Sequence, residues 1–449
     1  MKIVLKPQNL LPAFVKKLGF DQKLAVAVFI ILLGLRLMII NSPSPEVKVV
    51  DGETRVEGGL VFDEAHYVPA VRKLLRGESV NHEHPPLSKL LIAASMLVFG
   101  DNPVGWRLMP SLLSSAAVAL IPLIAYRLTR SRFATFFTTL LIAADVMFFN
   151  IGTIAMLDGP AFFFLFLATY MFLQTRYTST AIFFGLALLS KTSIVFNVAG
   201  LLLFSFLAIY SRHRKIMESL QDWSPLFEKT VLIGLAVFMA GLTVYDIGFR
   251  AYSNPFAHLD YMLNYHAQLK YNCTEYELPL RCTVVNQDGS TSIVDLPLSW
   301  ISPISPFAAA PYMVVTVTAG DRVWHPVAYY GVYSPYWWTT ALVLVYSLYM
   351  AVKSRGADTV NLFVFSWIAM SYLPYFPLAH LLQRWVYTFY FLPTLPAVAL
   401  GLSMMLREDR FSRYVLYGIA ALQLIWFFIY FPVKSDTHIH ILELLNLPR

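Results

Sequence analysis

The feature that most constrains this chain is a series of apolar stretches, each near the length of a membrane span. A transmembrane helix needs about 20 predominantly apolar residues. The sequence predicts eleven spans, over residues 24–41, 105–128, 133–151, 159–175, 179–192, 194–210, 229–249, 337–352, 359–378, 386–406 and 413–431. The stretch 87–99 is shorter and carries Lys89, so we expect a helix at the membrane interface there. This pattern indicates an all-α polytopic membrane protein.

Composition supports this class. Hydrophobic residues make up 57% of the 449 residues and charged residues only 14%, whereas soluble domains carry about 25% charged residues. The chain therefore has little soluble mass. Its net charge of +7 is explained by basic loops on one side of the membrane, so we expect no nucleic acid partner.

Basic residues also predict the orientation, because Lys and Arg are enriched in short cytoplasmic loops. With eleven spans the following residues share one side: Lys2, Lys6, Lys16, Lys17, Lys23, Arg127, Arg130, Arg132, Arg176, Arg212, Arg214, Lys215, Lys353, Arg355, Arg407, Arg410 and Arg413. The N-terminal segment 1–23 is then cytoplasmic, and the first span is retained rather than cleaved as a signal peptide. The segments that follow are a core of spans over 24–249 with an outer loop 42–104, an outer loop 250–336, spans over 337–431 and an outer tail 432–449.

The chain has two cysteines, Cys273 and Cys282, in the second outer loop. Their short separation in a polar loop, on the oxidising side of a membrane, favours a disulfide over two free thiols. Asn272 begins the triplet Asn-Cys-Thr, an acceptor pattern for N-glycosylation on that same side.

An acidic pair, Asp63 and Glu64, stands in the first outer loop, with His66 two residues on. The plain structural interpretation makes Asp63 the N-cap of a helix that ends near Gly77, and Glu64 a first-turn acid favoured by the helix dipole. That interpretation does not explain His66, which we regard as a residue that orients the site.

A second polar cluster follows in the same loop, where His82, Glu83 and His84 precede two prolines. One use would be a zinc site built from His66, His82, His84 and a carboxylate. The spacing of these residues matches no known zinc pattern, so we expect neither a metal nor another cofactor.

Three basic residues break the charge bias by lying on the outer side: Arg107, Lys191 and Arg384. Each alone is compatible with a side chain that snorkels to the interface. Three together predict a bound anion, and Asp158 beside them is either a helix cap or an orienting group. Carboxylates that accept a proton and cations that hold a phosphate, at headgroup depth, fit a lipid-linked phosphate substrate.

These residues resemble the protein O-mannosyltransferase family, polytopic enzymes with the GT-C glycosyltransferase fold. The resemblance rests on the segments FDEAHY, HPPLSKLLIA, GWRLMP, MLDGP, GLALLSK and RWVYTFYFLPTLPAVALG. It covers residues 24–210 and 337–431.

The resemblance implies transfer of mannose from dolichyl phosphate mannose to Ser or Thr hydroxyls, with inversion and without a required metal. Asp63 would then be the general base and Glu64 its partner at the acceptor. Arg107, Lys191 and Arg384 would hold the donor phosphate. Two further residues, His84 and Tyr387, would line the site.

The chain departs from the family pattern at two places. Thr192 stands where the family often has Trp, and the loop 250–336 is too short for the MIR domain of the eukaryotic enzymes. This suits an archaeal or bacterial member. The absence of a WWD motif and a D-x-D pair from the sequence argues against an oligosaccharyltransferase.

Two alternatives stay open. One is a GT-C enzyme that transfers another lipid-linked sugar to a lipid or glycan. The other is a transporter or scaffold, which the sequence favours less because its ionisable residues gather on one face and no repeat is visible. The expected partners of the leading hypothesis are membrane lipid, a dolichyl or polyprenyl phosphate sugar, secreted or membrane protein acceptors and, in one version, a second copy. The expected location is the cell membrane.

Overall fold

The structure is a computed structural model. It describes residues 18–44, 46–50, 53–57, 59–271, 273–277, 280–285, 289–302, 311–319 and 322–446. Asn272 and most of the basic N-terminal segment lie outside the described residues, so the glycosylation acceptor stays a prediction.

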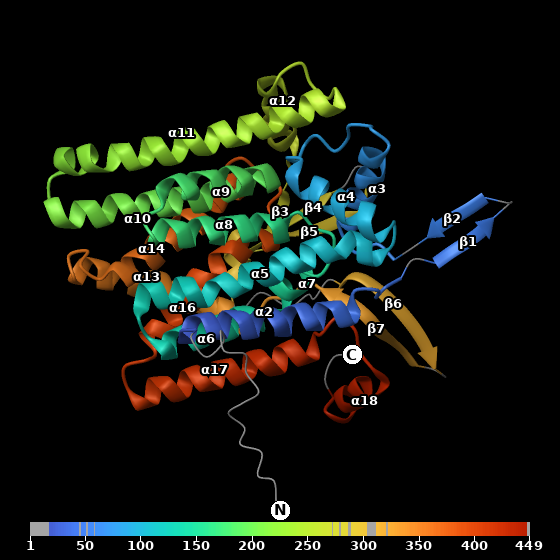
Figure 1. Ribbon diagram of the computed structural model, residues 1–449. Coiled ribbons are helices and arrows are strands. Elements are labelled where there is room, and N and C mark those ends of the chain that lie inside the picture. Colours follow the sequence, from blue (N-terminus) through green and yellow to red (C-terminus); the bar gives the residue numbers. More distant parts are fainter. Residues whose placement is uncertain are drawn as a thin grey trace, which may run out of the picture.

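Helices occupy all the positions at which spans are predicted. They are α2 Phe20–Ile39, α5 Pro103–Thr129, α6 Arg132–Ala143, α7 Val146–Ile151, α8 Asp158–Leu173, α9 Tyr177–Ser190, α10 Val195–His213, α11 Ile216–Phe249, α13 Thr340–Lys353, α14 Thr359–Tyr372, α15 Tyr375–His380, α16 Leu395–Met405 and α17 Arg410–Ile429. They run roughly along one direction as a bundle (Figure 1). Within the described residues, 7 helical stretches are long and apolar enough to cross a membrane. The chain is a multi-pass membrane protein, and the number eleven stays a prediction.

Several predicted spans are broken helices. The span over 133–151 divides into α6 and α7 at Asp145, whose carboxylate accepts from the backbone N–H of Phe148 at 2.8 Å and from the indole N–H of Trp337 at 2.7 Å. The span over 359–378 divides into α14 and α15 just before Pro374. The span over 386–406 begins as the 3₁₀ helix η6 Thr388–Thr394, which contains Pro393. Local capping and proline thus interrupt spans that hydropathy alone treats as continuous.

One close helix crossing fixes the end of α9. A Cβ atom added to Gly185 on α9 would lie 2.6 Å from the carbonyl oxygen of Gly234 on α11. Glycine on both helices therefore allows their backbones to meet. Beyond this crossing α9 continues to Ser190, and Lys191 is its C-cap residue.

The segments outside the bundle contain short helices and strands. The helix that ends near Gly77 and the helix over 87–99 confirm predictions from the sequence, whereas the other short helices and the strands were not predicted. The helices are α3 Glu64–Leu75, α4 Leu87–Phe99, α12 Pro255–Gln268 and α18 Asp436–Leu444, with 3₁₀ turns η2 Thr192–Ile194, η4 Pro297–Ile301 and η5 Pro335–Thr339. The strands form three antiparallel sheets: β1 Glu46–Val50 with β2 Glu53–Glu57, then β3 Cys273–Glu277, β4 Arg281–Val285 and β5 Thr291–Asp295, then β6 Pro311–Ala319 with β7 Arg322–Tyr330. The helical class is therefore right, with small sheets added outside the bundle.

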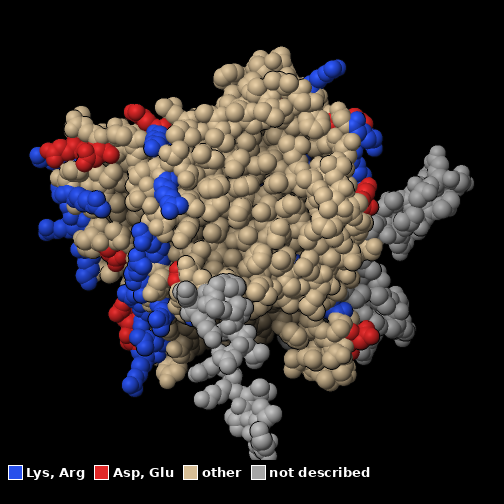
Figure 2. Space-filling view, in the orientation of Figure 1, with Lys and Arg blue, Asp and Glu red and all other residues tan. Residues whose placement is uncertain are grey.

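The two ends of the bundle differ in charge. α3, α4, α12 and the strands β1, β2, β6 and β7 lie toward one end, on the right and at the top of Figure 1. In the same orientation, most visible Lys and Arg gather at the opposite end, over the junction of α10 with α11 and the start of α17 (Figure 2). The basic loops thus share one end of the molecule, as the charge pattern predicts.

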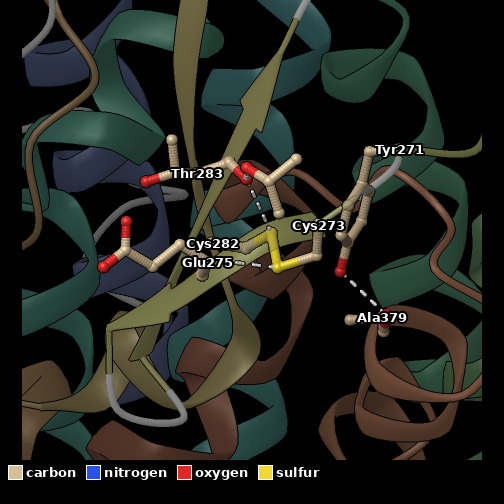
Figure 3. The surroundings of a disulfide bond; sticks show 7 residues. Tyr271, Cys273, Glu275, Cys282, Thr283 and Ala379 are labelled. Atoms are coloured by element: carbon tan, nitrogen blue, oxygen red, sulfur yellow. Dashed lines mark hydrogen bonds between the residues drawn. A yellow bond between two sulfur atoms is a disulfide. The ribbon is translucent and has the colours of Figure 1, made fainter.

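The three-stranded sheet carries the two cysteines. Cys273 on β3 and Cys282 on β4 are joined by a disulfide (Figure 3). Just before β3, Tyr271 donates from its hydroxyl to the carbonyl of Ala379 on α15 at 2.8 Å. The disulfide therefore closes a hairpin that is attached to the helical bundle.

Candidate active site

Asp63 directs its side chain away from the helix that it precedes. Its backbone is helical, with φ −69° and ψ −4°, and its carboxylate makes no capping hydrogen bond to α3. The preceding residue, Phe62, has a φ of 52°, which is unusual for a bulky side chain. Asp63 therefore occupies the expected N-cap position without capping the helix through its side chain, and the turn presents this carboxylate to a cavity.

Glu64 has a different environment, although it is the next residue. Its two carboxylate oxygens accept from Nε and Nη2 of Arg107, each at 2.8 Å, and both side chains are fully buried. Glu64 also accepts from the backbone N–H groups of Val61 and Ala155. This carboxylate is a structural anchor between α3, α5 and the segment after α7, not a partner of the acceptor.

Arg107 is fully engaged as well. Its remaining N–H groups donate to backbone carbonyls, from Nη1 to Ile40 and Pro43 and from Nη2 to Gly59. All five donors of a guanidinium are then used. The expectation that Arg107 holds a donor phosphate is corrected: its charge is paired inside the protein.

The cavity beside Asp63 has a volume of about 260 Å³. Its walls come from the loop 42–104, from the end of α12, from Lys191 and from the start of η6. The lining residues are Phe62, Asp63, His66, Tyr67, Asn81, Glu83, His84, Lys191, Tyr265, His266, Leu269, Tyr387, Phe389 and Tyr390. Five predicted site residues therefore meet here: Asp63, His66, His84, Lys191 and Tyr387. We call this space the acceptor-side cavity.

A second cavity, of about 230 Å³, adjoins the first. It is lined by His84, Lys191, Thr192, Ser193, Val195, Phe196, Leu263, His266, Tyr375, Leu378, Arg384 and Tyr390. His84, Lys191, His266 and Tyr390 line both spaces. Asp63 thus lies in one cavity and Arg384 in the next, with shared residues between them. We call the second space the donor-side cavity.

Lys191 stands at the junction of the two cavities. Its Nζ donates to the carboxylate of Asp158 at 2.7 Å and lies 4.6 Å from the ring centre of Phe389 and 5.0 Å from that of Tyr390. Its side chain is 11% exposed. Asp158 orients this ammonium from the first turn of α8, which agrees with the expected orienting role.

Arg384 is held mainly by one residue of α12. Its Nε donates to the carbonyl of His266 at 3.0 Å, and its Nη2 donates to Nδ1 of the same residue at 3.0 Å. Its Nη1 donates to the carbonyl of Trp385 at 3.1 Å. These contacts turn the planar guanidinium toward the donor-side cavity.

Electrostatics favour a proton-accepting carboxylate. Burial raises the pKa of Asp63 to about 6, although the positive charge of Lys191 opposes part of this shift. Burial lowers the pKa of His84 well below its ordinary value and that of His266 to about 4. Near neutral pH the imidazoles of His84 and His266 are therefore uncharged, while Asp63 is ionised with a basicity suited to general base catalysis.

The three histidines considered for a zinc site do not converge. His66 is exposed at the acceptor-side cavity. His84 packs against Tyr67 and His266, whereas His82 packs against Tyr252, with ring centres 5.2 Å apart. Within the described part of the chain, no three His, Cys, Asp or Glu side chains gather closely enough to hold a metal ion.

Sequence reasoning missed the contributions of α12 and Glu83. Glu83 lines the acceptor-side cavity, and Tyr265 and His266 reach it from α12. Glu83 was visible beside the two histidines but had no assigned role. α12 lies in the outer loop that the family resemblance does not cover, so its histidines and tyrosines carried no signal beyond their residue types.

Sequence comparison finds relatives for a segment that contains part of this site. Residues 83–243 match the family model described as dolichyl-phosphate-mannose-protein mannosyltransferase. The polyprenol-phosphate-mannose–protein mannosyltransferase of Mycobacterium tuberculosis is 35% identical over 114 residues, which is 24% of this chain and 22% of that relative. Over this segment the chain resembles the protein O-mannosyltransferase family. The enzyme of the same name from Corynebacterium glutamicum is 34% identical over 130 residues, 26% of this chain and 25% of the relative. The chain therefore matches about a quarter of the length of these curated relatives.

Solved structures show that the chain has the GT-C fold. The Saccharomyces cerevisiae protein O-mannosyltransferase Pmt1–Pmt2 complex bound to the sugar donor has a TM-score of 0.59 at 12% identity, over 94% of this chain and 91% of that chain. ArnT from Cupriavidus metallidurans bound to undecaprenyl phosphate has a TM-score of 0.55 at 14% identity, over 90% of this chain and 62% of that chain. At such identities the likeness is one of fold.

Proposed function

We propose that the chain is an inverting glycosyltransferase that moves mannose from a polyprenyl phosphate to a Ser or Thr hydroxyl of a protein. The observation that carries the proposal is the pair of adjoining cavities. One contains a carboxylate with raised basicity, Asp63, and the other is bordered by two cations, Lys191 and Arg384. The match of residues 83–243 to the mannosyltransferase family model supports the choice of sugar, donor and acceptor.

The reaction is a single displacement. The acceptor hydroxyl enters through the acceptor-side cavity and gives its proton to Asp63 as its oxygen bonds to the anomeric carbon of the sugar. The bond from that carbon to the phosphate oxygen breaks on the opposite face, and the leaving polyprenyl phosphate gains the electron pair. Lys191 and Arg384 stabilise this charge. These cations meet the electrostatic need of the leaving group, so the proposal assigns no step to a metal.

The lipid part of the donor would follow the apolar wall of the donor-side cavity. Val195 and Leu263 line this wall, and these two residues are 50% and 61% exposed. Exposed apolar groups beside a phosphate site suit a polyprenyl chain in contact with the membrane. The basic end of the bundle would face the cytoplasm and the site the opposite side of the cell membrane.

A transfer assay tests this function. Purified protein in lipid discs would receive polyprenyl phosphate carrying labelled mannose, together with a Ser/Thr peptide and a chelator. We expect label on the peptide with the anomeric configuration inverted relative to the donor. Label on a lipid or glycan instead would reject the protein acceptor, and intact donor under all conditions would reject the transferase.

A further inference from the structure

α12 lies outside the membrane helices and touches both halves of the site. The helix begins at Pro255, where the side chain of Asn254 accepts from the backbone N–H of Ala257 at 2.9 Å. It follows α11 at the top of Figure 1. Two of its histidines, His258 and His266, make the contacts that matter here.

His258 fixes the loop that carries His84. Its Nε2 lies 3.2 Å from the carbonyl oxygen of His82, to which it donates, and its Nδ1 lies 2.8 Å from the carboxylate of Asp246 on α11. The side chains of His258 and Asp246 are 1% and 2% exposed. This buried chain of contacts ties α11, α12 and the first outer loop together.

The contact between His266 and Arg384 determines which ring nitrogen of His266 carries the proton. A guanidinium only donates hydrogen bonds, so Nδ1 of His266 must accept from Nη2 of Arg384. The neutral ring then carries its proton on Nε2. The lowered pKa of His266, about 4, agrees with a ring that stays neutral at physiological pH.

The backbone beyond α12 reinforces this contact. Tyr271 donates from its backbone N–H to the carbonyl of Gln383, and Trp385 donates to the carbonyl of Leu269, each at 2.9 Å. The segment after His266 and the segment around Arg384 therefore pair along their main chains. The side chain of His266 adds the contact that sets the angle of the guanidinium.

We propose that His266 is a positioning residue, which holds the Arg384 guanidinium toward the donor-side cavity for the phosphate of the lipid donor. α12 then sets the relative positions of two site elements, because His258 on the same helix holds the loop of His84. This inference rests on the proposed function for the identity of the ligand. It assigns a role to an outer helix that the family resemblance leaves uncovered.

The test measures binding of dolichyl phosphate, without sugar transfer, to the full-length protein. His266→Ala should weaken binding roughly tenfold, because Arg384 loses the acceptor that orients one of its charged hydrogen bonds. His266→Asn should stay close to the wild-type affinity, since the Asn side-chain oxygen can replace Nδ1 as acceptor. Gln268→Ala, on an exposed position of the same helix, is the matched control and should bind like the wild type.

Binding to the double variant separates a positioning role of His266 from a merely structural one. We expect the His266→Ala change to have no further effect on binding once Arg384→Ala is present, because the two residues act as one unit. Wild-type affinity for His266→Ala, equal losses for Ala and Asn, or a full additional loss in the Arg384→Ala background would each overturn the inference. If the binding pattern holds but the wild type transfers no mannose to peptide, the proposed function fails and the positioning role stands.

Discussion

At the scale of residues, two adjacent carboxylates have opposite roles. Successive residues at the start of a helix point in directions about 100° apart, so Asp63 meets a cavity and Glu64 meets the core. The sequence predicted that both carboxylates belong to the functional site. It could not predict which member is buried, because the partner of Glu64 is Arg107, 43 residues away. Arg107 was wrongly assigned to the donor phosphate for the same reason. The backbone carbonyls that accept its remaining hydrogen bonds cannot be identified from a sequence.

The buried pair predicts a stability effect. Glu64→Gln should destabilise the protein by about 3 to 5 kcal/mol, because Arg107 would remain buried without its counter-charge. Thermal or denaturant unfolding of the purified protein in detergent measures this. Asp63→Asn is the control and should unfold close to the wild type. A Glu64→Gln protein of normal stability that has lost only turnover would instead place Glu64 in the chemistry.

The raised pKa of Asp63 predicts a pH dependence of activity. A base must be ionised to accept a proton, and its ionised fraction falls as pH drops below its pKa of about 6. We expect kcat/KM to be flat above this pH and to fall about tenfold per pH unit below it. A pH profile of mannose transfer from pH 4.5 to 8 checks this. A profile without a break in that range would show that another group accepts the proton.

At the scale of elements, the sequence predicted where helices lie but not where they break. Hydropathy averages over a window, so it detects 133–151 as one stretch. The break at Asp145 depends on Trp337, which is distant in sequence and supplies the buried carboxylate with a donor. Most strands were missed for a related reason: β1 to β5 have five residues each, too few for the long alternating pattern that marks a strand.

The disulfide predicts a local stabilisation. Replacing both cysteines, Cys273→Ser with Cys282→Ser, should cost about 2 to 3 kcal/mol in the chain-entropy model for a loop of this length. Unfolding of the double variant measures the loss, and the wild type treated with a reductant should behave in the same way. Equal stability of the oxidised wild type and the double variant would mean that the attachment of Tyr271 to α15 already fixes the hairpin.

At the scale of the whole molecule, charge and chemistry occupy opposite ends. The basic loops gather at one end (Figure 2), and the two cavities lie with α3 and α12 near the other. The charge pattern predicted this separation, because the position of the basic end depends only on which helix ends carry Lys and Arg. The division into donor-side and acceptor-side cavities could not be predicted, since it requires the first outer loop, α9, α12 and η6 to meet.

The proposed orientation predicts which positions a membrane-impermeant thiol reagent reaches. The native cysteines are joined, so a single introduced cysteine reports its own side. Gln268→Cys, at the end of α12, should react in intact cells. Lys353→Cys, at the end of α13, should react only after the membrane is permeabilised. The reverse pattern would place the site in the cytoplasm.

The central claim is that Asp63 accepts the proton of the acceptor hydroxyl. The most direct measurement compares wild type and Asp63→Asn for turnover in mannose transfer and for donor affinity. Asn keeps the shape of Asp but cannot take the proton, so we predict that turnover falls by about 10²- to 10⁴-fold while donor affinity stays near the wild-type value. An Asp63→Asn protein with wild-type turnover would contradict the claim.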